Sequence, residues 1–157
     1  MEQTYATLFS LINKVQIQGD KYLETVTSRQ FMAMVAILHL PKNEATLNNI
    51  ARKLGTTKQS AKQLMNILEN KGYVITIPSK RDKRAVNITI TESGKQIMMD
   101  CNIKGIRFLE NMFGDFTTQE LETLWGTLKK LYRFDGEAMD GFEAEAPFDD
   151  FEKEKRE

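Results

Sequence analysis

The chain has 157 residues, and its 22 basic and 22 acidic side chains give a formal net charge of zero. This length suits one core domain with extensions, and the single cysteine excludes an intramolecular disulfide framework. The longest apolar run, Phe31 to Leu38, has 8 residues against the ~20 that span a bilayer. Because the start also lacks the pattern of a secretory signal, we expect a cytoplasmic protein.

Two helices are predicted before the first proline-containing turn. Apolar residues at helical spacing predict an amphipathic helix that begins near Thr4 and ends between Gly19 and Leu23. A second helix is predicted from a capping box at Thr27 to just before Pro41. Its apolar residues lie on more than one side, so this helix is expected at the centre of the core.

Two shorter helices follow, joined by a tight turn. The first is predicted after a Thr46 cap and ends at Gly55, which supplies a left-handed residue. The second is predicted to open with a capping box from Thr56 to Gln59 and to end at Gly72. Its outward residues carry amide, hydroxyl and ammonium groups, which can bond base edges and phosphates. These residues are Thr57, Lys58, Gln59, Ser60, Lys62, Gln63 and Asn66.

A charged loop separates two predicted strands. Alternating β-branched residues in 73–77 and 86–90 predict half-buried antiparallel strands. The sequence from Arg52 to Arg84 holds nine basic and two acidic residues, a net charge of +7. This order of elements predicts a mainly α fold with a small antiparallel β-hairpin, a winged helix-turn-helix whose second helix and wing bind duplex DNA. The charged wing residues are Lys80, Arg81, Asp82, Lys83 and Arg84.

Two more helices are predicted after the hairpin. A Thr91 cap begins a long helix that runs towards Phe116, and a capping box at Thr117 begins the last helix. The last helix carries an apolar stripe larger than a compact domain of this size requires, and such stripes usually mark an interface. The stripe consists of Leu121, Leu124, Trp125, Leu128, Leu131 and Tyr132.

Residues 82–94 carry a family resemblance. The segment Asp-Lys-Arg-Ala-Val-Asn-Ile-Thr-Ile-Thr-Glu-Ser-Gly is similar to the signature Asp-x-Arg, a short spacer, then Leu-Thr-x-x-Gly, with Ile90 in place of the usual Leu. On this segment and the preceding helix-turn-helix, the chain resembles the MarR family of bacterial transcriptional regulators from about Thr27 to Phe116. The resemblance implies the order α-α-α-α-β-β-α-α and a homodimer with entwined terminal helices. Its interface would include the C-terminal stripe together with Leu8, Phe9 and Ile12.

The resemblance also assigns roles in the wing. Arg84 corresponds to the wing arginine, and Asp82 to the acid that orients it. A guanidinium suits the narrow, electronegative minor groove, and Lys80, Arg81 and Lys83 would then contact phosphates.

Four regions are expected along the chain. They are an N-terminal dimerisation helix (1–27), the winged helix-turn-helix (28–90), C-terminal dimerisation helices (91–134) and an acidic tail (135–157). The tail has a net charge of −7, which suggests a flexible solvating segment or one that docks on the basic face.

The sequence shows neither a nucleophile with its base nor a catalytic carboxylate pattern, so we expect no enzyme and no cofactor. His39 and Cys101 are the only residues of their kinds, and one of each does not make a metal site. We expect His39 to cap helix carbonyls or pack at the surface, and Cys101 to pack as a small apolar residue.

The favoured function is a homodimeric regulator, with repression as the favoured direction, that reads a pseudo-palindromic operator in double-stranded DNA. The family resemblance adds release by a small aromatic ligand. The alternative is a winged-helix module that binds another protein and has little affinity for DNA. The density of positive charge on the second helix of the helix-turn-helix and on the wing favours DNA binding.

Overall fold

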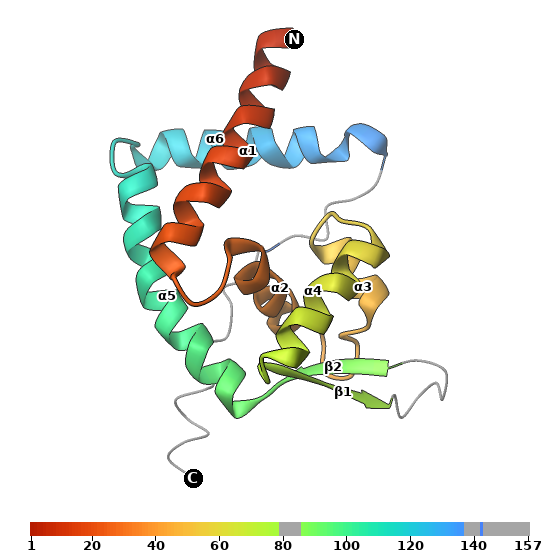
Figure 1. Ribbon diagram of the computed structural model, residues 1–157. Helices are drawn as coiled ribbons and strands as arrows, with labels where there is room; N and C mark the ends of the chain where they lie inside the picture. Colours follow the sequence, from red (N-terminus) through yellow and green to blue (C-terminus); the bar gives the residue numbers. More distant parts are fainter. Residues whose placement is uncertain (79–85, 137–141, 143–157) are drawn as a thin grey trace.

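The computed structural model describes residues 1–78, 86–136 and 142 (Figure 1). It has the expected mainly helical fold with one two-stranded antiparallel sheet. In chain order the elements are α1 (Glu2–Leu23), α2 (Ser28–His39), α3 (Leu47–Lys53), α4 (Lys58–Asn70), β1 (Val74–Pro78), β2 (Val86–Ile90), α5 (Glu92–Phe113), α6 (Thr118–Tyr132) and the short 3₁₀ helix η1 (Arg133–Asp135).

Helix α2 occupies the centre of the core, as its sequence predicted. It packs against α1, α3, α4, β2 and α5, and its Met34 is completely buried. Ile50 of α3, Leu68 of α4 and Met98 of α5 are also fully buried in the same cluster. The core therefore joins the helix-turn-helix to the long helix α5 in one apolar unit.

Most helix starts follow the predicted caps. The capping boxes at Thr27 and Thr117 are both formed, and the Thr46 and Thr91 hydroxyls accept backbone N–H groups as single caps. Helix α1 differs, because it begins at Glu2, has no side-chain cap and continues through Gly19 to Leu23.

The predicted capping box from Thr56 to Gln59 is wrong by one residue. The N-cap of α4 is Thr57, whose hydroxyl accepts the Ser60 N–H at 3.1 Å. Thr56 still belongs to the preceding turn, because its N–H donates to the Ala51 carbonyl at 2.9 Å. Gly55 has the expected left-handed backbone, with φ of 60°.

The hairpin has a regular antiparallel register from Val74 opposite Ile90 to Pro78 opposite Val86. In β1 the buried side chain is Val74, whereas Ile75 and Ile77 are 46% and 42% exposed. The prediction of a half-buried strand is therefore wrong for β1, which buries only its first residue because the rest of the strand extends beyond the core. A third backbone segment joins the sheet edge, because the Ile88 N–H donates to the Ala45 carbonyl.

Helices α1 and α5 pack along each other (Figure 1). At one end they contact the winged unit, which comprises α2 to β2. The Tyr22 and Phe108 rings lie 5.3 Å apart, and Asn111 Nδ2 donates to the Tyr22 hydroxyl at 2.9 Å. Nearer the winged unit, Lys104 of α5 forms an ion pair with Glu24. Their hydrogen bond lowers the pKa of Glu24 and raises that of Lys104. The winged unit is thus attached to α5 through the segment after α1.

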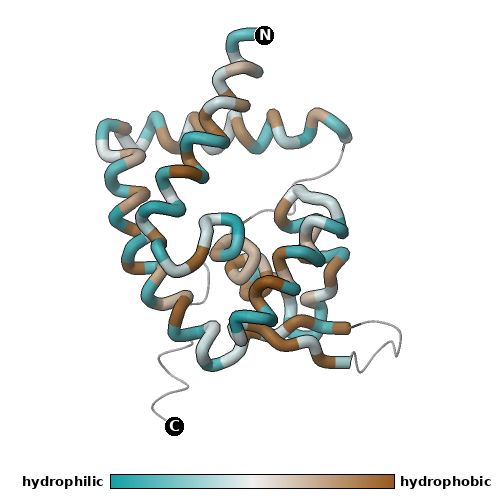
Figure 2. The backbone as a smooth tube through the Cα atoms, viewed as in Figure 1, coloured by the Kyte–Doolittle hydropathy of each residue, from teal (hydrophilic) through white to brown (hydrophobic). Residues whose placement is uncertain are grey.

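Polar and apolar residues are interleaved along the helices (Figure 2). Within the described ranges, no helix combines the length and the apolar content needed to cross a membrane.

Gly94 explains why the sequence signature ends in glycine. It is buried in the first turn of α5, where an added Cβ would overlap the Tyr73 carbonyl oxygen and approach Ile90 Cγ2 to 2.8 Å. The same carbonyl accepts the Thr91 N–H at 3.0 Å. Glycine therefore allows the start of α5 to pack directly on the backbone that enters the hairpin.

Gly94→Ala is expected to destabilise the protein by about 1–3 kcal/mol, because backbone atoms must move to admit the methyl group. Gly105→Ala is the matched control on the same helix, where nothing lies within 4 Å of the added Cβ. The control should be neutral or up to about 1 kcal/mol more stable, because alanine favours helix. Urea unfolding of the two variants measures the difference, and equal midpoints would contradict this packing.

Candidate nucleic-acid interface

The seven predicted recognition residues lie together on α4 and its N-cap. Six of them are exposed, and Ser60 is half-buried. The Ser60 side chain accepts a hydrogen bond from the Thr57 hydroxyl at 3.0 Å. The opposite side of α4 is buried in the core through Ala61, Met65 and Leu68. The helix thus presents a polar, cationic face to solvent, and apolar packing on its other side holds it in place.

Interactions at its C-terminal end fix the position of α4. Lys71 Nζ donates to the Thr25 carbonyl and to Gln30 Oε1, both at 3.2 Å. Glu69 Oε1 accepts the Thr76 N–H of β1 at 3.2 Å. These bonds tie α4 to the α1–α2 connection on one side and to the hairpin on the other.

Two of the nine cations counted in the sequence are therefore engaged or covered within the chain. Lys71 is engaged in anchoring α4, and Lys53 is only 8% exposed at the end of α3. Charge counting could not separate them from Lys58 and Lys62, which are exposed on α4. The predicted wing residues Lys80, Arg81, Asp82, Lys83 and Arg84 lie outside the described residues.

The predicted interface residues lie on α1 and α6. Leu8, Leu121 and Leu124 are half-buried. The others expose between 38% and 64% of their surface. These are Phe9, Ile12, Trp125, Leu128, Leu131 and Tyr132. No residue of α6 is buried within the chain, and Figure 2 shows apolar segments along both helices.

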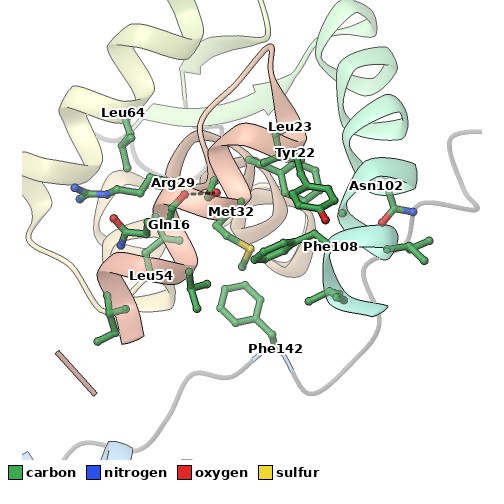
Figure 3. Close-up of a pocket in the computed structure, with 18 of the residues that line it drawn as sticks. Gln16, Tyr22, Leu23, Arg29, Met32, Leu54, Leu64, Asn102, Phe108 and Phe142 are labelled. Carbon is green, nitrogen blue, oxygen red and sulfur yellow. Dashed lines mark hydrogen bonds between the residues drawn. The ribbon is translucent and has the colours of Figure 1, made fainter. Parts of the chain in front are cut away.

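An apolar cavity of about 800 Å³ lies between α1, α2, α5 and the turn from α3 to α4. Figure 3 shows Tyr22, Met32 and Phe108 among its walls. The sequence did not assign residues to this cavity. Its available signal was the surplus of apolar residues on α1 and α5, such as Ile12 and Ile106, which do not enter the core.

The single histidine and cysteine have structural roles. His39 Nδ1 lies 2.9 Å from the Val35 carbonyl, to which its N–H donates. Cys101 is buried in the core, and this burial raises the pKa of its thiol. Both placements agree with the sequence expectation. Among the described residues, no group of three or more His, Cys, Asp and Glu side chains could hold a metal ion.

A helix-turn-helix with an exposed polar second helix, followed by a β-hairpin, defines a winged helix-turn-helix regulator of transcription. Residues 25–85 match the model of the MarR family. The chain is also 33% identical over 131 residues to the HTH-type transcriptional regulator SarZ of Staphylococcus haemolyticus, covering 81% of this chain and 82% of the relative. The protein belongs to the MarR family of DNA-binding transcriptional regulators, which are not enzymes.

Solved structures show the same fold. The Staphylococcus aureus MepR–DNA complex superposes with a TM-score of 0.73 at 23% identity, covering 82% of this chain and 96% of that one. The organohalide-sensing regulator RdhR, in its 2,4-dichlorophenol-bound form, has a TM-score of 0.73 at 18% identity, covering 83% of this chain and 78% of that one.

Thr57→Ala is expected to destabilise the start of α4 by about 1 kcal/mol, because the Ser60 N–H loses its acceptor. Thr57→Ser keeps the hydroxyl and is the matched control. Hydrogen exchange of the first-turn amides of α4 would measure the local change, while urea unfolding measures the global one. If alanine and serine protected these amides equally, Thr57 would not be the cap.

Proposed function

We propose that this MarR-family regulator acts as a homodimeric repressor that binds a pseudo-palindromic operator and is released from it by a small aromatic ligand. The exposed face of α4 carries the proposal, because its hydroxyl, amide and ammonium groups stand on a helix that is capped at its N-terminus and attached to the rest of the chain at its C-terminal end. Repression is the direction that we propose, in which a dimer that covers its operator would exclude other proteins from that stretch of duplex.

In the DNA complex, α4 would lie in the major groove. Lys58, Gln59, Lys62, Gln63 and Asn66 are the proposed groove contacts, with Thr57 and Ser60 near phosphate at the N-terminus of the helix. Arg84 would enter the minor groove, oriented by Asp82, while Lys80, Arg81 and Lys83 neutralise phosphates. Both α4 and the wing belong to the proposed DNA-binding region, 28–90.

A second copy of the chain would cover the exposed apolar side chains of α1 and α6. The absence of buried side chains within α6 supports this assignment, because exposed apolar stripes of this size usually mark interfaces. The proposed dimerisation regions are 1–27 and 91–134, with 135–157 as an acidic tail. Two recognition helices related by a two-fold axis read half-sites about 10 base pairs apart.

The cavity supports ligand control. Its volume of about 800 Å³ lies in the range of small-molecule sites, about 300–1,000 Å³. It touches α1 and α5 on one side and the α3–α4 turn on the other, and a similar fold holds 2,4-dichlorophenol in RdhR. A ligand that binds more tightly to a dimer with the wrong spacing of recognition helices would draw population away from the DNA-bound form.

Arg84→Ala is expected to weaken specific operator binding by about 1–3 kcal/mol, because alanine cannot reach into the minor groove. Lys21→Ala is the control, since Lys21 is exposed on α1, outside the proposed DNA face. The operator is first obtained by selecting bound fragments from random duplexes. Fluorescence anisotropy at several salt concentrations then measures affinity, and each phosphate that the protein neutralises should add roughly 0.9 to the magnitude of the slope of log affinity against log salt.

Two results would contradict this proposal. One is a selection that enriches no duplex at low salt, which would favour the protein-binding alternative. The other is an Arg84→Ala variant with the same operator affinity as the Lys21→Ala control.

Leu128→Asp is expected to prevent dimerisation, because a carboxylate would be buried against the apolar partner surface without compensation. Operator affinity should fall at the same time. Thr123→Asp introduces the same charge on the other side of α6 and should leave the dimer intact. Light scattering after gel filtration gives the oligomeric state, and a monomeric Leu128→Asp protein that retained full operator affinity would exclude the two-fold mechanism.

A further inference from the structure

Phe142 packs against the winged unit. Among the residues after Gly136, the structure describes this one. Its ring is half-buried, packs against the hydrophobic core cluster and lines the apolar cavity. Figure 3 shows the Phe142 ring pointing towards Met32 and Phe108.

Away from the cavity, the ring meets two side chains whose chemistry suits an aromatic group. Its edge-to-face contact with His39 has a centroid separation of 5.1 Å and an interplanar angle of 83°. Lys53 Nζ lies 5.4 Å from the ring centroid. Edge-to-face pairs and a cation over a ring face are both attracted by the quadrupole of the aromatic system. We call the space bounded by His39 and Lys53 the aromatic notch.

One member of the notch, His39, is held in place by a contact that does not involve Phe142. The His39 ring is oriented by its Nδ1 hydrogen bond to the Val35 carbonyl. Lys53 ends α3 and is 8% exposed with the ring in place. The notch therefore offers an oriented imidazole and a cation to an aromatic ring.

Phe142 lies at the edge of the core rather than at its centre. Met34, Ile50 and Met98 are completely buried by α2, α3, α4, α5 and the hairpin, whereas Phe142 remains half-buried at the border of the cavity. The ring therefore lies between the edge of the core and the cavity. Its departure would join the notch to the cavity.

We propose that Phe142 is the resident occupant of the aromatic notch, and that a small aromatic ligand in the cavity takes the notch by displacing it. This inference rests on the proposed ligand control and names the chemistry and the internal competitor of that site. The apparent ligand affinity is reduced in proportion to the fraction of molecules in which the notch is open. Because Lys53 directly precedes the turn into α4, the exchange of rings occurs next to the recognition helix.

The test compares Phe142→Ala with Phe134→Ala in the full chain. Phe134 is 84% exposed and does not line the cavity, so it is a matched control for the loss of one phenyl ring near the C-terminal end of α6. The probe is N-phenyl-1-naphthylamine, an uncharged aromatic fluorophore, titrated by fluorescence. Phe142→Ala should bind it about tenfold more tightly, as expected when the notch is open in about a tenth of wild-type molecules, and Phe134→Ala should match the wild type.

Phe142→Ala also enlarges the cavity, so a second measurement tests the displacement of the ring separately. The side-chain CH₂ resonances of Lys53 should be displaced by the ring current of Phe142, and this displacement should vanish in Phe142→Ala but persist in Phe134→Ala. In the wild type, the probe should change the same resonances. Phe142→Leu, which keeps apolar volume without a ring, should lose the displacement even if the alanine variant proves poorly folded.

Three outcomes would overturn the proposal: no binding of the probe to either the wild type or Phe142→Ala, equal probe affinity in the wild type and Phe142→Ala, or an equal gain in Phe134→Ala. Operator binding without the probe is measured in parallel. Its absence would refute the proposed function, whereas the titration and the Lys53 resonances would still decide whether Phe142 occupies the notch.

Discussion

The burial of α2 on several sides is the constraint on which the rest of the structure depends. Met34 is completely buried, and α1, α3, α4, α5 and β2 all pack on this one helix. The turn from α3 to α4 can therefore adopt one orientation only, because Ile50 and Leu68 must both reach the same apolar cluster. The orientation of the recognition helix follows from core packing rather than from its polar residues.

The same packing links the two ends of the molecule. Lys71 attaches α4 to the α1–α2 connection, and Lys104 of α5 forms an ion pair with Glu24 in that connection. A movement of α1 against α5 would therefore change the position of the C-terminal end of α4. This arrangement gives a physical basis for coupling between the cavity, which is lined by α1 and α5, and the proposed DNA face.

Local chemistry explains which features were predictable from the sequence. The caps at Thr27 and Thr117 involve partners three residues away, so spacing alone identifies them. The start of α4 was placed one residue early, because the hydrogen bond from Thr56 to Ala51 extends the turn and depends on the left-handed Gly55. A sequence pattern shows candidate caps but not which of two adjacent threonines the closed turn selects.

The order of elements, the family signature that ends in Gly94 and the polar side of α4 could be predicted from the sequence, because they depend on residues close together in the chain. The folded structure was needed to show that Gly94 is buried against Tyr73, that Lys71 anchors a helix, that Lys53 is buried beside Phe142, and that α1, α2 and α5 line one cavity. Each of these depends on residues far apart in sequence, whose distances are set by packing around α2 and not by any periodicity.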